Sequence, residues 1–220
     1  MTRRRLLAAM SALQAMCGHD AAAGGRQLNL MFDGDSISAG LGSTPGHGLD
    51  GVVAAGLDAP LRLNNVSVPG RPVLNCLQFY GQRVAPLFSP EFRANVIVFH
   101  AGDNDVSQGR DAAHTYAAFT DYVEAAHRQG WKVVVSTELR RFDFPPPKQA
   151  DLQAYNARLR QNHARADAVV DLDAEARFVA PEERHNTDLF LPDGVHPSDG
   201  GYAILADMLV PAIKRVSSTR

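Results

Sequence analysis

Cysteine, an excess of charge of either sign, and long apolar runs are all scarce in this sequence. Only two of its 220 residues are cysteine, which excludes a disulfide-dense scaffold and a zinc site of four thiolates. A net charge of −2 provides no basic field for binding nucleic acid through its phosphates. No stretch of the sequence reaches the roughly 20 apolar residues of a membrane span. We therefore expect one globular domain of ordinary size, without a nucleic-acid partner or stable membrane insertion.

The first 23 residues have the pattern of an export signal. Three consecutive arginines, Arg3–Arg5, precede a short apolar run, and the small residues Ala21–Ala23 follow it. This order is typical of a secretory signal peptide, and the arginines resemble the twin-arginine export pattern of bacteria. The alternative is an amphipathic N-terminal helix of the mature protein. The pattern predicts a periplasmic or secreted bacterial protein with residues 1–23 as signal peptide and residues 24–220 as the working domain.

Short apolar runs alternate with longer amphipathic segments along the rest of the chain. Strands that alternate with helices form parallel sheets through right-handed crossovers. We therefore predict a three-layer αβα sandwich, flavodoxin-like, with about five parallel strands. The Gly-rich segment Gly46–Gly51 is expected to be a flexible loop. The predicted strands are Leu28–Phe32, Leu61–Val68, Val96–Phe99, Trp131–Val135 and Ala168–Leu172, and the predicted helices are Pro72–Leu87, Asp111–Arg128, Lys148–Arg165 and about Ser198–Lys214.

Four short polar blocks fall at the ends of predicted strands or just before the last helix. Ligands of such sheets bind beyond the carboxyl ends of the strands. Each block alone is an ordinary cap or turn, but the four together, in this order, resemble the SGNH, or GDSL, hydrolase family. The resemblance covers nearly all of the chain after the signal segment. The blocks are Gly34-Asp35-Ser36, Pro69-Gly70, Gly102-Asp103-Asn104-Asp105 and Asp193-Gly194-Val195-His196-Pro197.

The resemblance implies a serine esterase that forms an acyl-enzyme. Ser36 is the expected nucleophile, His196 the base that takes its proton, and Asp193 the group that orients the imidazole. The backbone N–H groups of Ser36 and Gly70 and the side-chain amide of Asn104 are the expected oxyanion donors. No metal or organic cofactor is implied. The expected substrate is a small-molecule or saccharide ester, and the lack of a long apolar lid favours short acyl groups, acetyl above all.

Several residues outside the four blocks also have a predicted role. Arg140, Arg141 and Phe142 lie in the loop before the third predicted helix and are candidates to line the substrate site. In the alternative interpretation they only cover the edge of the sheet. His100 directly follows a predicted strand and is expected to be a buried, hydrogen-bonded histidine rather than a ligand. Cys76 is expected to be a small core residue of its helix.

Two other functions fit parts of the sequence. Phe32–Asp35 and Gly102–Asp105 resemble the nucleophile and magnesium blocks of haloacid-dehalogenase-type phosphatases. That family has serine/threonine and lysine blocks before its magnesium block, whereas Thr137 and Lys148 come after it here, and residues 193–197 stay unexplained. The other alternative is a catalytically silent carbohydrate-binding module. The intact set of serine, glycine, asparagine, aspartate and histidine argues against it.

Overall fold

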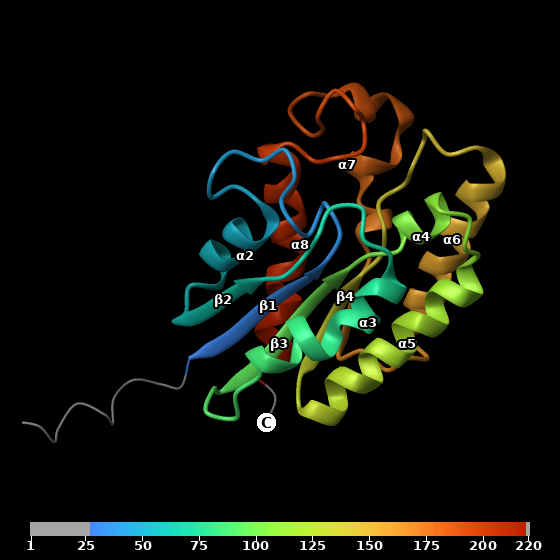
Figure 1. Ribbon diagram of the computed structural model, residues 1–220. Coiled ribbons are helices and arrows are strands. Elements are labelled where there is room, and N and C mark those ends of the chain that lie inside the picture. Colours follow the sequence, from blue (N-terminus) through green and yellow to red (C-terminus); the bar gives the residue numbers. More distant parts are fainter. Residues whose placement is uncertain (1–26, 219–220) are drawn as a thin grey trace, which may run out of the picture.

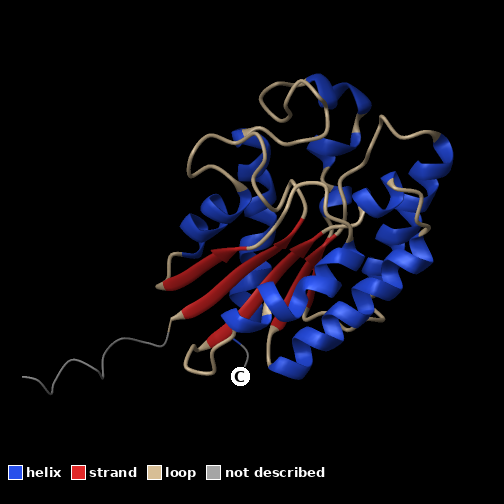
Figure 2. Ribbon diagram, viewed as in Figure 1, coloured by secondary structure: helices blue, strands red, loops and turns tan. Residues whose placement is uncertain are grey.

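The computed structural model describes residues 27–218 and shows a sheet between two layers of helices (Figure 1, Figure 2). The predicted signal peptide lies outside the described residues. Five strands lie in the order β2-β1-β3-β4-β5, and every neighbouring pair is parallel, which confirms the predicted sandwich. The strands are β1 Leu28–Gly34, β2 Leu61–Asn65, β3 Ala94–His100, β4 Lys132–Ser136 and β5 Ala168–Val170.

Several helices differ from the prediction, and the short helices Asp103–Ser107 and Ala176–Val179 were not predicted. Helix α2 begins at Leu49, inside the segment Gly46–Gly51 that was expected to be a loop, and it buries Leu49, Val53 and Leu57 at four-residue spacing. Helix α3 ends at Arg83 rather than Leu87 and is followed by a 3-10 turn, because Pro86 has no N–H to continue the helix. The helices are α2 Leu49–Leu57, α3 Val73–Arg83, α4 Asp103–Ser107, α5 Ala112–Gln129, α6 Pro146–Gln161, α7 Ala176–Val179 and α8 Asp199–Ser218, and the 3-10 helices are η1 Ala85–Leu87, η2 Leu172–Ala174 and η3 Pro181–His185.

The core has two halves, one on each face of the sheet. Successive side chains of a strand point to opposite faces. Leu30 and Phe32 of β1 therefore pack with α2 and α8, whereas Met31 between them packs with α3 and α5. Strands buried on both faces explain the near-continuous apolar runs in the sequence. Among the described residues, no helix combines the length and apolar character needed to cross a membrane.

All functional blocks fall at one rim of this sheet. Because the strands are parallel, their carboxyl ends lie at the same edge, at the top of Figure 2. The loops after β1, β2, β3 and β4 leave from that edge, and the segment before α8 returns to it (Figure 1). The fold therefore brings together residues that are far apart in the sequence.

Candidate active site

Ser36 lies in the turn that follows the buried strand β1. Gly34 approaches β3 so closely that a Cβ atom built on it would lie 1.9 Å from the backbone oxygen of His100, so only glycine fits there. The Asp35 N–H donates to the same oxygen at 3.2 Å. The Asp35 carboxylate accepts a hydrogen bond from the Ile37 N–H at 3.0 Å, which bends the chain around Ser36. These contacts hold the serine at the carboxyl edge of the sheet.

Asp193 and His196 lie in a tight turn just before helix α8. Gly194 between them has a φ of +64°, a left-handed conformation that favours glycine. One carboxylate oxygen of Asp193 accepts from the N–H groups of Val195 at 2.9 Å and His196 at 3.0 Å. The other oxygen lies 2.7 Å from Nδ1 of His196, and Nε2 of that ring lies 2.9 Å from Oγ of Ser36. The structure thus joins the three predicted catalytic residues in one hydrogen-bonded chain.

The carboxylate in this chain is stabilised in its charged form. The Asp193 side chain is 46% exposed and that of His196 is 19% exposed. Partial burial alone raises the pKa of Asp193, but the hydrogen bonds from the His196 ring and from the backbone outweigh it and lower that pKa below its ordinary value. Asp193 is therefore ionised at neutral pH and can stabilise an imidazolium ion on His196.

The three predicted oxyanion donors follow three neighbouring strands. Gly70 comes after β2, Ser36 after β1 and Asn104 after β3, and these strands are adjacent in the sheet. Gly70 has a φ of +77°, and no atom lies within 4 Å of the position a Cβ would take, so its backbone borders open space. The Asn104 amide Nδ2 lies 3.5 Å from Asp35 Oδ2, beside the nucleophile turn. The strand order therefore gathers the predicted donors around Ser36.

Two buried carboxylates hold the segment after β2, and the esterase interpretation of the sequence gave neither of them a role. Asp33 accepts from Arg71 Nη1 at 3.0 Å and from the Tyr122 hydroxyl at 2.8 Å. Burial raises the pKa of Asp33 to about 6, although the bonds from Tyr122 and Arg71 act to lower it. Asp105 accepts from the Val73 N–H at 2.7 Å and so ties α4 to the start of α3. The sequence signal for Asp33 is a charged residue in an apolar strand, which requires a buried partner.

The predicted substrate-lining residues surround a separate small cavity. Arg140, Arg141 and Phe142, together with residues of α6, line a cavity of about 220 Å³. Arg140 donates to Asp173 at 3.0 Å, and Arg141 donates to Asp103 of α4 at 2.5 Å. Arg141 is thereby anchored at the helix that carries Asn104, one of the predicted oxyanion donors. A role for the three residues in substrate binding stays a prediction.

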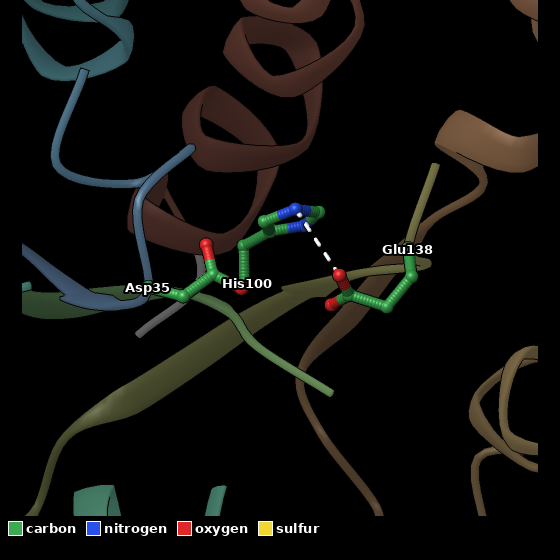
Figure 3. A group of neighbouring side chains, drawn as sticks. All are labelled: Asp35, His100 and Glu138. Carbon is green, nitrogen blue, oxygen red and sulfur yellow. Dashed lines mark ion pairs between the residues drawn. The ribbon is translucent and has the colours of Figure 1, made fainter. Parts of the chain in front are cut away.

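A buried histidine also lies at this rim. His100 is fully buried, with Nδ1 2.8 Å from Oγ of Ser136, so the prediction of a buried, hydrogen-bonded histidine is confirmed. Cys76 is 1% exposed in the core, as predicted. The His100 ring faces Glu138, and Asp35 lies on its other side (Figure 3). Each of Asp35, His100 and Glu138 offers one atom within 4.8 Å of the others, so these residues could hold a metal ion.

The fold and this site define a class of protein. A parallel αβα sandwich with a serine, a histidine and an aspartate joined at its carboxyl edge is the arrangement of a serine hydrolase. The chain belongs to the GDSL-like lipase/acylhydrolase family, whose family model matches residues 32–204, and it is an ester-hydrolysing enzyme. No curated protein matches the sequence.

Solved structures share this fold at low sequence identity. A lipolytic protein of the G-D-S-L family from Veillonella parvula DSM 2008 is 20% identical, with a TM-score of 0.67 over 86% of this chain and 99% of that chain. Axe2, an acetylxylan esterase from Geobacillus stearothermophilus, is 18% identical, with a TM-score of 0.62 over 90% of this chain and 97% of that chain. The psychrotrophic esterase EstA from Pseudoalteromonas sp. is 17% identical, with a TM-score of 0.64 over 85% of this chain and 97% of that chain. At these identities the likeness establishes the fold.

Proposed function

We propose that the protein is a serine esterase that cleaves carboxylic esters through an acyl-enzyme on Ser36. The observation that carries this proposal is the unbroken chain from Ser36 Oγ to His196 Nε2 at 2.9 Å and from His196 Nδ1 to Asp193 at 2.7 Å. A serine hydroxyl is a weak nucleophile at neutral pH and needs such a base. His196 takes the hydroxyl proton as Oγ attacks the ester carbonyl, and Asp193 stabilises the resulting imidazolium.

The oxyanion formed by this attack needs donors that are already in place. The N–H groups of Ser36 and Gly70 and the amide of Asn104 fill this role. Collapse of the tetrahedral intermediate expels the alcohol, which takes its proton from His196. Water then attacks the acyl-enzyme with His196 again acting as base, which releases the acid and restores the serine. Loss of one oxyanion donor typically lowers turnover by about 10²–10³.

The competing magnesium phosphatase needs a carboxylate on β1 that a phosphate ester can reach. Asp33 is 1% exposed and is bonded to Arg71 and Tyr122. Asp35 is also 1% exposed and bonds the backbone of its own turn. Neither carboxylate is placed to attack a phosphate, whereas Ser36 is half-buried at the rim and hydrogen-bonded to a base.

We infer that the preferred ester has a short acyl group, acetyl above all, on a saccharide alcohol. A cavity of about 410 Å³ adjoins Gly70, and its lining includes Asn75, Phe79 and Gln108. The Phe79 side chain is 43% exposed on α3. An exposed aromatic ring beside amide side chains suits the apolar face of a sugar ring and its hydroxyl groups. The structural neighbour Axe2 is an acetylxylan esterase, which agrees with this inference.

The activity is tested with p-nitrophenyl acetate, p-nitrophenyl phosphate plus Mg²⁺, and a serine-directed organophosphonate. We expect acetate hydrolysis and covalent labelling of Ser36, located by mass spectrometry, and we expect Ser36→Ala to lose both. Ser43→Ala, in the same loop, is the matched control and should keep full activity. Magnesium-dependent phosphate turnover would overturn the proposal, and a folded protein without activity in either assay would favour the binding module.

The substrate class is tested with p-nitrophenyl esters of increasing acyl length alongside acetylated saccharides. We expect kcat/KM to fall with acyl length, and Phe79→Ala to raise KM for the saccharide without changing kcat for p-nitrophenyl acetate. Leu63→Ala removes a comparably exposed apolar side chain from the edge strand β2 and should change neither value. A preference for long acyl chains would contradict the short-acyl inference. An unchanged saccharide KM in Phe79→Ala would contradict the saccharide site.

We also propose, from the N-terminal sequence, that the enzyme is exported. In a bacterial host the expected mature protein begins at Gly24 and is found outside the cytoplasm. Replacing Arg3–Arg5 by lysine tests the twin-arginine route and should leave the precursor inside the cell. A wild-type protein that keeps residues 1–23 and stays in the cytoplasm would contradict export.

A further inference from the structure

Three buried ionisable side chains meet beneath the nucleophile turn. Asp35 follows β1, His100 ends β3, and Glu138 follows β4, so the cluster spans three neighbouring strands. Their exposed fractions are 1%, 0% and 1%. One ligand atom from each lies within 4.8 Å of the other two, and Figure 3 shows the three side chains gathered together.

Two atoms of this cluster lack hydrogen-bond partners within residues 27–218. They are Nε2 of His100 and Oε1 of Glu138. Buried polar atoms are nearly always paired, so each exception needs a physical explanation. Oγ of Ser136 lies 2.8 Å from Nδ1 of His100 and can accept a hydrogen bond from an N–H at that nitrogen. In that tautomer Nε2 carries a lone pair that faces Glu138. Metal-binding histidines have the same arrangement, because a hydrogen bond at one ring nitrogen leaves the other free to bind the metal.

The separation between the histidine and the glutamate favours a shared metal ion over a hydrogen bond. His100 Nε2 and Glu138 Oε2 are 3.4 Å apart. A hydrogen bond between nitrogen and oxygen spans about 2.7–3.2 Å. Two ligands that each lie about 2.0–2.2 Å from a tetrahedral zinc ion are about 3.3–3.6 Å apart. The observed distance falls in the second range.

The cluster is also short of positive charge. Among the side chains that the structure describes, no lysine or arginine forms an ion pair with Asp35 or Glu138. Arg141 is occupied with Asp103 and Asp143. A divalent cation would compensate both carboxylates, since buried charges are normally paired or bound to metal.

We propose that Asp35, His100 and Glu138 bind one divalent transition-metal ion, with zinc as the ion that suits these ligands. Imidazole nitrogen and carboxylate oxygen are both zinc ligands. The site lies beneath the nucleophile rather than at the open rim, so its role is structural. Asp35 also accepts from the Ile37 N–H and lies 3.5 Å from the Asn104 amide. A metal that fixes Asp35 therefore fixes the turn of Ser36, and we assign these ligands as positioning residues.

The experiment measures metal content rather than activity. Because the site is buried, the full chain is refolded from guanidinium with Zn²⁺ or with EDTA and then desalted through EDTA. We expect the zinc-refolded protein to retain about one zinc per chain and to melt at a higher temperature than the EDTA-refolded protein. Protein refolded with Co²⁺ should show the intense visible absorption of a tetrahedral site.

Matched variants locate the ion. Glu138→Gln, which keeps the side-chain shape, should lower the retained zinc at least about tenfold. Asp105→Asn changes an equally buried carboxylate outside the cluster and should retain zinc. Ser36→Ala should also retain it, so the outcome does not depend on the esterase proposal. If the wild-type protein keeps no zinc and its zinc-refolded and EDTA-refolded preparations melt at the same temperature, the proposal is wrong and the three side chains only share protons. This outcome does not depend on whether Glu138→Gln folds. Zinc retained equally by Glu138→Gln would also overturn it.

Discussion

Two histidine–carboxylate pairs lie at the same edge of the sheet and have opposite surroundings. His196 and Asp193 are 2.7 Å apart, with side chains 19% and 46% exposed. His100 and Glu138 are 3.4 Å apart, and both side chains are 1% exposed. Hydrogen bonds lower the pKa of Asp193 against the effect of its partial burial. Burial raises the pKa of Glu138 and lowers that of His100 to about 4.

The contrast shows that the same two functional groups acquire different chemistry from their solvation. An imidazole next to an ionised, hydrogen-bonded carboxylate can accept a proton from a serine and hold the resulting charge. A buried imidazole stays neutral more readily, because burial removes the water that would stabilise the imidazolium ion. The exposed pair can therefore act as a base, whereas the buried pair serves structure or binds a cation.

Removing each histidine in turn should have opposite effects on catalysis and on stability. We expect His196→Ala to lower kcat for p-nitrophenyl acetate by about 10⁶ with little change in stability, because a triad acts as a unit. We expect His100→Ala to cost about 3–5 kcal/mol of unfolding free energy, because it empties a filled core position. Urea unfolding and steady-state kinetics measure both effects. Similar kinetic losses in the two folded variants would contradict the division of roles.

The second change tests the carboxylate of the exposed pair. Asp193→Asn can keep the turn, because its amide oxygen still accepts from the N–H groups of Val195 and His196. The amide cannot hold the imidazole in the tautomer that attacks, so we expect kcat to fall by about 10⁴. Asp199→Asn, at the nearby start of α8, is the matched control and should stay within about tenfold. Equal losses in the two variants would show that Asp193 has no specific role.

The third change extends the comparison to stability, with a buried and an exposed ion pair. Arg71→Met removes the cation beside the buried Asp33 carboxyl group, and we expect it to cost about 3–5 kcal/mol. Arg128→Met breaks the pair with Glu124, whose side chains are 70% and 61% exposed, and should cost less than about 1 kcal/mol. Urea midpoints measure both costs. A cost for Arg71→Met as small as that for Arg128→Met would contradict the structural role of the buried pair.

Much of the fold follows from local sequence patterns. The central strands are buried on both faces, so their apolar runs predict them directly. Helix α2 was missed because Gly51 and Gly56 lower helix propensity and hid the regular spacing of Leu49, Val53 and Leu57. Glycine therefore concealed a helix whose stability comes from packing against α8.

Some contacts of the candidate site also follow from local sequence, whereas others depend on the order of the strands. Asp193 and His196 are three residues apart, so their contact is a local turn that the sequence predicts well. Glu138 meets His100 only because β3 and β4 are neighbours in the sheet, which is a matter of strand order and not of local pattern. Arg71 meets Asp33 for a similar reason, across β1 and β2. The Asp193–His196 pair was therefore predictable from local sequence and its link to Ser36 from the family resemblance, whereas the buried cluster required the tertiary structure.

The smallest effect concerns the pH dependence of the exposed pair. Because the folded pKa of Asp193 lies below the unfolded value of about 3.9, its contribution to stability is present above that pH and is lost as the pH falls through the folded pKa. Solvent screens a side chain that is 46% exposed, so we expect wild type to exceed Asp193→Asn by less than about 1 kcal/mol at neutral pH. Urea unfolding near pH 7 and near pH 3 measures the difference, which should shrink in acid and in high salt. A difference that grew in acid would mean that folding raises the pKa of Asp193, and the two carboxylates of the comparison would then behave alike.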